Sequence, residues 1–409
     1  MKILVVADYF FPCQPGGLAR VAWDVAQALA RRGHDVELVA AGAGDSAAST
    51  TTTVVEGVLC HLFRRPLFAN WDPRRLTAAV AAYAGQVSRA LAGKQFDVIH
   101  FHSIFTGAAV LRAMKQAPQR AALVYTVHSP VVQEQRLTWS QQGLVGFVNQ
   151  AVGIPVARRM ERRLLACAHA THVLSRFTAN ELAREHPQVR FPCQLIPHFF
   201  YGEWRRRLTR AEARSRLGWP SNRPALFTVR QLRHRYGIDD AITAVAPLAA
   251  AGRCTFHIAG DGPNMGKLRT QIDDSGCRES ITLMGRLPDD TLQVGYQAAD
   301  LFLLPTRALE CFGLISLEAM SFGLPVLGTN VGAIPEVIGP VLPGFLSPPG
   351  DPEAFRAKIT DYLDGRIIPP AEEVIRGHVT ANYSELAVMT QYELLYERAR
   401  ATKAKLPTS

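Results

Sequence analysis

Two successive series of short β-rich runs, each alternating with amphipathic helical segments, place the strongest constraint on the fold of this 409-residue chain. The strands expected in the first half are "KILVVA", "DVELVA", "FDVIHFH", "ALVYTVH", "ATHVLS" and "CQLIPH". Those expected in the second half are "ALFTVR", "CTFHIAG", "ITLMG", "DLFLLPT" and "LPVLGTN". Such alternation is typical of parallel sheets with both faces covered, and the length is too great for one ordinary core. The sequence therefore predicts an α/β protein with two doubly wound sheets.

The helical segments show the matching apolar periodicity. In the first expected helix, which Gly33 ends, one face carries Leu18, Val21, Ala22, Val25 and Leu29. Further helices are expected near residues 238–250, 264–274, 290–298 and 313–322. Each half therefore contains enough strand–helix units to form its own sheet.

The domain boundary is expected near residue 200, where Pro197, aromatic residues and Gly202 interrupt the pattern. We predict a first Rossmann-like domain over residues 1–200, a second over 201–383, and a final amphipathic helix with a tail over 384–409. Ligands of open α/β sheets bind at the C-terminal ends of the strands. Two such halves therefore predict a cleft between them that is lined by strand ends.

Composition excludes several classes of protein. Hydrophobic residues make up 48% of the chain and charged residues 20%, as in a soluble globular protein, and no apolar run approaches the length of a membrane span. The N-terminal "MKILVVADYFF" is expected to be a first strand and not a signal peptide. Seven scattered cysteines without a C-x-x-C spacing argue against a metal or disulfide framework. We therefore expect a cytoplasmic protein.

The net charge of +10 comes largely from arginines. They gather in "RRPLFANWDPRR" (64–75), "ARRMERR" (157–163) and "WRRRLTRAEARSR" (204–216). Three interpretations compete: solvated helix faces, a nucleic-acid surface, or a patch that meets anionic lipid or phosphate. No nucleic-acid motif accompanies the charge, so nucleic acid is not expected as a partner.

The run "LECFGLISLEAM" contains two glutamates in apolar surroundings, although unpaired buried charge is costly. A strand–loop–helix interpretation starts a helix at Gly313, where unbonded N–H groups and the helix dipole form an anion site. A diphosphate would then bind at Gly313, Leu314 and Ile315. Glu310 would lie in the loop before the helix, and Glu318 would accept hydrogen bonds from a ribose diol. The alternative is one solvated helix glutamate and one surface-loop glutamate.

The longer segment "ECFGLISLEAMSFGLPVLGTNVGAIPEVI" resembles the Glu-x7-Glu signature of retaining family 4 glycosyltransferases, which belong to glycosyltransferase group 1. Other motifs resemble those of the family in the same order, so the resemblance covers essentially the whole chain. It implies the GT-B fold, in which two Rossmann-like domains face a central cleft and a C-terminal helix crosses back to the first domain. It also implies that Phe312 belongs to the nucleotide-sugar site.

In the first half, "DYFFPCQPGGLARVAWDVAQALARRGHDV" resembles the first strand, Gly-Gly loop and first helix of the family. The resemblance implies that Gly16 and Gly17 let a phosphate or sugar approach the backbone; the alternative is a simple turn and cap. It also implies that His128 lies beside the donor sugar, where it would accept a hydrogen bond from a hydroxyl or stabilise developing charge. His102 is a weaker candidate near the acceptor, and His100 is expected to be structural.

In the second half, "FTVRQLRHRYGIDDAITAV" resembles the family segment that supplies an arginine and a lysine to the donor diphosphate. Arg230 matches the arginine. Tyr236 occupies the usual lysine position, so we expect Arg235 to be the second cation and Arg233 to be solvated. Two cations on the leaving diphosphate are needed if no metal is present.

The remaining motifs concern the nucleotide base and a metal ion. The resemblance implies that the backbone around Arg286 and Leu287 meets the base. "GDGPNMG" is one residue out of register with the dinucleotide fingerprint, so we discount it. The chain has no Asp-x-Asp, and its adjacent aspartate pairs are expected at helix ends or caps. We therefore expect no metal and no other cofactor.

Together these features predict transfer of a hexosyl-type group from a UDP- or GDP-linked sugar to an acceptor hydroxyl, with His128 and Glu310 holding the sugar as the catalytic residues. The resemblance implies retention at the anomeric carbon by same-face attack, so Glu310 would position the sugar and not act as a nucleophile. The alternatives are a nucleotide-sugar epimerase of the same fold or a non-catalytic nucleotide-sugar-binding protein. A nicotinamide dehydrogenase ranks lower, because its glycine fingerprint is missing.

The acceptor is expected on the side of the first domain formed by residues 129–168. Trp139, apolar residues and an arginine cluster in this segment could rest on an anionic membrane and reach a lipid-linked glycan. They could equally enclose a small natural product, and a polysaccharide acceptor also remains open.

Overall fold

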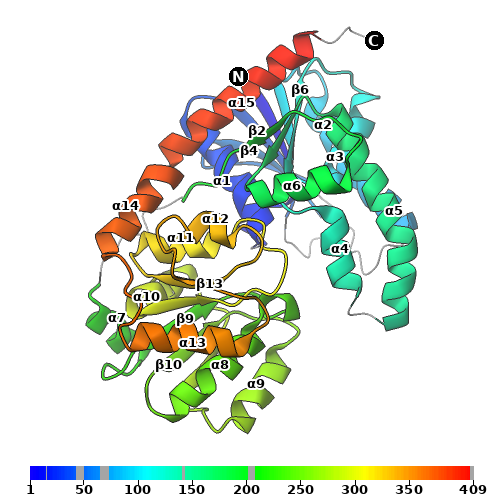
Figure 1. The fold of residues 1–409 in the computed structure, drawn as a ribbon. Coiled ribbons are helices and arrows are strands. Elements are labelled where there is room, and N and C mark those ends of the chain that lie inside the picture. The colour runs from blue at the N-terminus through cyan, green and yellow to red at the C-terminus, as the bar shows by residue number, and fades with distance from the viewer. Residues whose placement is uncertain (15, 43–49, 65–72, 141–142, 201–207, 406–409) are drawn as a thin grey trace. The chain divides into compact units, whose positions relative to one another are not determined.

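The computed structural model describes residues 1–14, 16–42, 50–64, 73–140, 143–200 and 208–405. The chain divides into two compact units (Figure 1). The first consists of Met1–His198 together with Glu385–Ser409, and the second consists of Phe199–Ser384. Each unit has a predominantly parallel sheet with its own helices, as the sequence predicted.

In the described residues, the sheet of the first unit has eight strands in the order β3-β4-β2-β1-β5-β6-β7-β8. Their bounds are β1 Lys2–Tyr9, β2 Asp35–Ala41, β3 Thr51–Val55, β4 Val58–Phe63, β5 Val98–Phe101, β6 Ala122–Val127, β7 Ala170–Val173 and β8 Cys193–Leu195. Six of these strands were predicted and are confirmed. The hairpin β3–β4 was not predicted; its two strands are antiparallel, and Glu56 and Gly57 both have positive φ in the two-residue turn between them.

Seven helices of the described chain belong to this unit: α1 Gly17–Arg31, α2 Pro73–Leu91, α3 Ile104–Met114, α4 Val131–Trp139, α5 Gly143–Cys167, α6 Arg176–Glu185 and α15 Glu385–Lys405. The predicted apolar face of α1 is confirmed, since Val21, Val25 and Leu29 are buried. Helix α15 packs on α1 and on β6 and β7, and Glu393 of α15 binds both Nε and Nη2 of Arg32 at 2.8 and 2.7 Å. The C-terminal helix is thus part of the first unit.

The sheet of the second unit is entirely parallel, with the order β11-β10-β9-β12-β13-β14. Its strands are β9 Ala225–Val229, β10 Thr255–Ala259, β11 Ile281–Gly285, β12 Leu301–Leu304, β13 Val326–Thr329 and β14 Leu346–Ser347. Its helices are α7 Arg210–Leu217, α8 Ile238–Ala250, α9 Met265–Asp274, α10 Asp289–Ala298, α11 Leu314–Ser321, α12 Ile334–Ile338, α13 Pro352–Leu363 and α14 Glu372–Tyr383. The five predicted strands and four predicted helices are confirmed.

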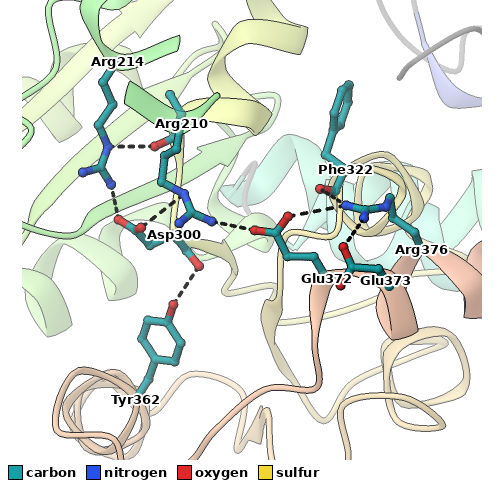
Figure 2. Close-up of polar contacts among 9 residues, drawn as sticks. Arg210, Arg214, Asp300, Phe322, Tyr362, Glu372, Glu373 and Arg376 are labelled. Atoms are coloured by element: carbon teal, nitrogen blue, oxygen red, sulfur yellow. Dashed lines mark hydrogen bonds and ion pairs between the residues drawn. The ribbon is translucent and has the colours of Figure 1, made fainter. Parts of the chain in front are cut away.

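A polar network at the N-terminal end of β12 joins several helices of the second unit (Figure 2). Asp300 forms ion pairs with Arg214 and Arg210, and its backbone carbonyl accepts a hydrogen bond from Tyr362 at 2.8 Å. Arg210 also donates to Glu372 at 2.9 Å. These arginines of the 204–216 run therefore hold the fold together, whereas residues 204–207 lie outside the described part of the chain, as do residues 65–72 of the first arginine run.

The expectation that Trp139 contacts a membrane is wrong. The indole is 3% exposed and packs on Val132 and Ile154 between α4 and α5. A Cβ added at Gly153 would clash with the same ring, so the two helices meet closely here. None of the helices in the described part of the chain combines the length and apolarity that a membrane span requires.

Candidate functional site

Two oppositely charged side chains meet at the C-terminal edge of the second sheet. Arg230 follows β9 and Glu310 lies in the loop after the neighbouring strand β12. Nη2 of Arg230 forms an ion pair with the Glu310 carboxylate and donates to Thr306 Oγ1 at 3.3 Å. Both side chains are largely buried, with 9% and 12% of their surface exposed. The structure thus joins the residue predicted for the diphosphate to the residue predicted for the sugar.

Tyr236, at the expected lysine position, organises both arginines. The guanidinium of Arg230 lies over its ring at 4.0 Å from the centroid, and that of Arg235 lies over it at 4.7 Å. Nη2 of Arg235 also donates to the Tyr236 hydroxyl at 2.6 Å. An aromatic ring attracts cations through its electron-rich face, so it stabilises two like charges near each other. The stacking of the two guanidinium groups on Tyr236 was not predicted from the sequence, although Arg235 and Tyr236 are adjacent there.

The backbone around Glu310 is held in an unusual conformation. Leu309 has a φ of 56°, and it is one of two described non-glycine residues with positive φ. The carbonyl oxygen of Glu310 accepts a hydrogen bond from Ala333 N at 2.7 Å. A Cβ at Gly332 would clash with that oxygen, so a glycine is required there. Backbone strain of this kind is concentrated at functional sites.

The helix expected to begin at Gly313 is confirmed as α11, and anion binding at its N-terminus stays a prediction. Gly313 caps the helix in the left-handed conformation, with φ 86° and no side-chain cap. The N–H groups of Leu314 and Ile315 therefore belong to the first turn, which has no acceptors within the helix. Glu318, one turn further on, accepts a hydrogen bond from Tyr296 at 2.8 Å. Tyr296, on α10, was not among the predicted site residues.

Phe312 and Arg286 differ in their surroundings. The ring of Phe312 is 5% exposed and packs on Tyr383 at 6.1 Å, so only its backbone stays a candidate for substrate contact. Arg286 is exposed and Leu287 half-buried, directly after β11 and at the same edge of the sheet as Arg230.

The "GDG" sequence has a structural explanation. Gly260 has a φ of 123°, and a Cβ there would clash with the carbonyl oxygen of Arg230. Gly260 N donates to the Gly285 carbonyl at 2.7 Å. The glycine therefore lets three strand ends approach one another, which explains "GDG" without a dinucleotide fingerprint.

Arg307 was missed by sequence reasoning. Its Nε and Nη2 bind both carboxylate oxygens of Asp240 at 2.7 and 2.5 Å, and its Nη1 lies 2.9 Å from Asp239. Its backbone N donates to the Arg235 carbonyl at 2.8 Å. The aspartate pair at the start of α8 therefore ties the loop of Glu310 to the loop of Arg235. Among the described residues, no group of three or more His, Cys, Asp or Glu side chains is arranged to hold a metal ion, and metal independence stays a prediction.

In the first unit, Gly16 and Gly17 lie exposed at the start of α1. Gly16 has extended backbone, with φ 164°, and a Cβ there would meet nothing within 4 Å. Neither conformation nor packing therefore requires glycine at position 16. About two turns along α1, the buried carboxylate of Asp24 accepts hydrogen bonds from Arg20 at 3.0 Å and from His198 at 3.1 Å.

Histidines gather on the α15 face of the first sheet. Side chains alternate along a strand, so His100 and His102 share a face with Thr126 and His128. Nδ1 of His102 lies 2.9 Å from Nε2 of His128, whereas His100 is fully buried and contacts Thr126 and Tyr396 of α15. Burial, together with the nearby His172 and His198, lowers the pKa of His128 to about 3. In the ligand-free protein His128 is therefore neutral near pH 7, which argues against the charged role considered above.

Two family models match the chain. "Glycosyltransferase Family 4" matches residues 15–201, and "Glycosyl transferases group 1" matches residues 209–376. A 2-deoxystreptamine glucosyltransferase of Streptomyces kanamyceticus is 30% identical over 220 residues, which are 51% of this chain and 55% of that protein. An N-acetyl-alpha-D-glucosaminyl L-malate synthase of Bacillus anthracis is 22% identical over 388 residues, or 94% of this chain and 95% of that protein. For the first two curated relatives, the match spans about half of their length, 55% and 49%.

Solved structures show the same architecture. Sucrose-phosphate synthase from Thermosynechococcus elongatus has a TM-score of 0.82 at 20% identity, covering 98% of this chain and 99% of that chain. HepE of Anabaena in complex with UDP-glucose has a TM-score of 0.72 at 19% identity, covering 97% and 100%. At these identities the likeness shows the fold alone, which is GT-B. With the two family matches, it establishes that the chain belongs to the group 1, family 4 glycosyltransferases.

Proposed function

We propose that this protein transfers a hexosyl-type group from a nucleoside diphosphate sugar to an acceptor hydroxyl, with retention at the anomeric carbon. The Arg230–Glu310 ion pair beside the start of α11 carries the proposal, because it joins a phosphate-binding cation to a sugar-binding carboxylate. A UDP-linked donor is supported by the UDP and UDP-glucose complexes of HepE, and a GDP-linked donor is the second candidate. The relatives described above do not favour the epimerase or the non-catalytic alternative.

The diphosphate would bind to Arg230, Arg235 and the N-terminus of α11. Nε of Arg230 is buried and has no hydrogen-bond partner among the described residues, so it can donate to a phosphate oxygen. Guanidinium groups and a helix N-terminus together stabilise the negative charge that develops on the leaving diphosphate. This arrangement supports transfer without a metal ion. Glu318 would bind the ribose, and the backbone at Arg286 and Leu287 would bind the base.

Glu310 would position the sugar. Its ion pair with Arg230 stabilises the carboxylate and makes it a weaker nucleophile, which supports same-face attack over double displacement. In the first unit, His128 would bind a sugar hydroxyl, and the exposed backbone at Gly16 and Gly17 would let the donor approach closely.

The donor is identified by a thermal-shift screen of UDP- and GDP-linked sugars, followed by mass analysis with hydroxyl acceptors. The proposal expects one donor to give acceptor plus hexose and an equal amount of nucleoside diphosphate. An isomerised donor formed without acceptor would instead identify an epimerase. Binding of a donor with no chemistry under any acceptor condition would favour the non-catalytic alternative.

For the acceptor side, we propose that α5 contacts an anionic membrane surface. Val145, Val148 and Val152 follow one face of α5 and are 54–59% exposed, and Phe147 beside them is 70% exposed. Further along the helix, the exposed residues include three arginines, Arg159, Arg162 and Arg163. Apolar side chains next to basic ones suit the boundary of an anionic bilayer.

Sedimentation with vesicles of phosphatidylglycerol and phosphatidylcholine at low salt tests this contact. We expect Phe147→Asp to weaken binding several-fold, whereas Val374→Asp, at an exposed apolar residue of α14, should leave it unchanged. If the wild-type protein does not sediment with the vesicles, the membrane contact is wrong and a small water-soluble acceptor is favoured.

All seven cysteines are free, which supports the predicted cytoplasmic location.

A further inference from the structure

A connected chain of buried hydrogen bonds crosses the first sheet beneath α15, and its proton positions follow from its partners. Nε2 of His172 lies 2.8 Å from the Ile196 carbonyl oxygen, which only accepts, so this nitrogen carries the proton. Burial lowers the pKa of His172 to about 4, so the ring is neutral and its Nδ1 is an acceptor. The Thr126 hydroxyl, 2.8 Å away, therefore donates to Nδ1 of His172.

The same reasoning determines the tautomer of His100. Because the single proton of Thr126 is already donated to His172, its oxygen must accept from Nε2 of His100 at 2.5 Å. Nδ1 of His100 is then an acceptor for the Tyr396 hydroxyl at 2.9 Å. Every member of this chain has one defined role, and α15 supplies its first donor.

In the neighbouring pair His102–His128, either histidine could donate the hydrogen bond that joins the two rings. The ring of His102 is tilted by 36° against that of His100, with centroids 4.2 Å apart, and its own Nδ1 contacts Nε2 of His128 at 2.9 Å. The other nitrogen, Nε2 of His102, is buried without a hydrogen-bond partner among the described residues. If His128 donated, His102 would bury an N–H without a partner. If His102 donates, only a lone pair is left without one, and an orphaned buried N–H is the rarer and costlier case.

We infer that His102 is a positioning residue for the proposed transfer: its Nδ1–H donates to Nε2 of His128, so that His128 presents its Nδ1–H to an oxygen of the donor sugar. This inference rests on the proposed function. It reverses the expectation that His128 accepts a hydrogen bond from the sugar. Nδ1 of His128 has no partner among the described residues, and the residue is only half-buried, so this nitrogen is the one left to meet a ligand.

The tautomer can be read without any activity measurement. Long-range ¹H–¹⁵N spectra of the full-length protein labelled with ¹⁵N-histidine distinguish protonated from unprotonated ring nitrogens, and His128→Asn identifies the signals of His128. We expect wild-type His128 to be protonated at Nδ1. In His102→Leu the Nε2-protonated form should appear, and in His102→Asn, whose amide can donate from nearly the same place, the wild-type form should return. His169→Asn changes another histidine of the same unit, which accepts from Leu123 N at 2.9 Å, and should leave the His128 signals unchanged.

Kinetics give a second, independent reading. Loss of one oriented hydrogen bond should lower kcat/KM for the nucleotide sugar on the order of tenfold in His102→Leu, with recovery in His102→Asn. Affinity for the nucleoside diphosphate alone should not change. An Nε2-protonated His128 in the wild-type protein, or one unaffected by His102→Leu, overturns the inference. If His102→Leu does not fold, the wild-type spectrum alone decides. Absence of transfer by the wild-type protein would instead refute the proposed function and leave the assigned hydrogen bond intact.

Discussion

Replacing Glu310 by glutamine removes one charge and changes almost no volume at the centre of the proposed donor site. Arg230, whose side chain is 9% exposed, would keep the Thr306 hydroxyl and the ring of Tyr236 as neighbours. Breaking a fully buried ion pair costs about 3–5 kcal/mol. Because the glutamine oxygen can still accept a hydrogen bond, we expect the free energy of unfolding to fall by only about 1–2 kcal/mol.

The effect on transfer should be larger than the effect on stability. A hydrogen bond from a sugar hydroxyl to a carboxylate contributes about 1.5–3 kcal/mol. Loss of about 2–3 kcal/mol in the transition state corresponds to a decrease in kcat/KM of roughly 30- to 150-fold. Affinity for the nucleoside diphosphate should stay within about twofold, because Arg230 keeps its charge.

Steady-state kinetics with the identified donor, calorimetric titration of the nucleoside diphosphate and urea denaturation measure these three quantities. Glu372→Gln is a matched control, because it also removes a carboxylate that is bound to arginines, in the network of Figure 2. It should lose some stability and keep normal turnover. Near-normal turnover of Glu310→Gln with normal donor affinity would refute the role assigned to Glu310.

Gly16→Ala should keep the wild-type melting temperature, because a Cβ there meets nothing within 4 Å. If the donor approaches this backbone, the variant should lower kcat/KM on the order of tenfold. Unchanged kinetics would contradict that approach. Tyr236→Phe should bind the nucleoside diphosphate nearly as the wild type does, whereas Tyr236→Leu should lose about 0.5–1 kcal/mol of binding in calorimetry; equal affinities of Phe and Leu variants would refute the cation–π role. Burial lowers the pKa of His128 to about 3 and that of His172 to about 4, below their ordinary value of 6.5. Between the lowered pKa of each histidine and its ordinary value, the unfolded chain therefore binds more protons than the folded chain. The free energy of unfolding, measured in urea, should fall as the pH decreases from about 6.5 to about 4, by up to about 1.4 kcal/mol per pH unit for each of the two histidines. A His172→Gln variant with the same pH slope as the wild type would contradict this assignment.

The parallel sheets and the positions of most of their strands along the chain were predictable, because buried parallel strands appear in a sequence as short apolar runs. The placement of Arg230 and Glu310 at one sheet edge also follows from this pattern, since Arg230 comes directly after β9 and Glu310 lies in the loop that follows β12. Their ion pair does not follow, because it depends on β9 and β12 being neighbours after a crossover. The hairpin β3–β4 was missed although "VVEGVL" contains a two-residue turn signal, since its first strand, Thr51–Val55, is polar and largely exposed.

The individual roles of aromatic and histidine side chains were the least predictable part. Trp139 looked like a membrane anchor in the sequence, but the small Gly153 leaves room for its ring between two helices. The pairing of His102 with His128 requires the register of β5 on β6, in which Phe101 is opposite Tyr125. The stack of two arginines on Tyr236 depends on the conformation of a loop, which strand and helix periodicity do not specify.

Mass spectrometry of reactions that combine UDP- and GDP-linked sugars with hydroxyl acceptors tests the central claim most directly. We predict one pairing in which the acceptor gains a single hexose-type residue while an equal amount of nucleoside diphosphate is released, and in which Glu310→Gln and Arg230→Met each reduce both products together. Conversion of the donor to an isomer in the absence of acceptor, or full product formation by both variants, would contradict the account.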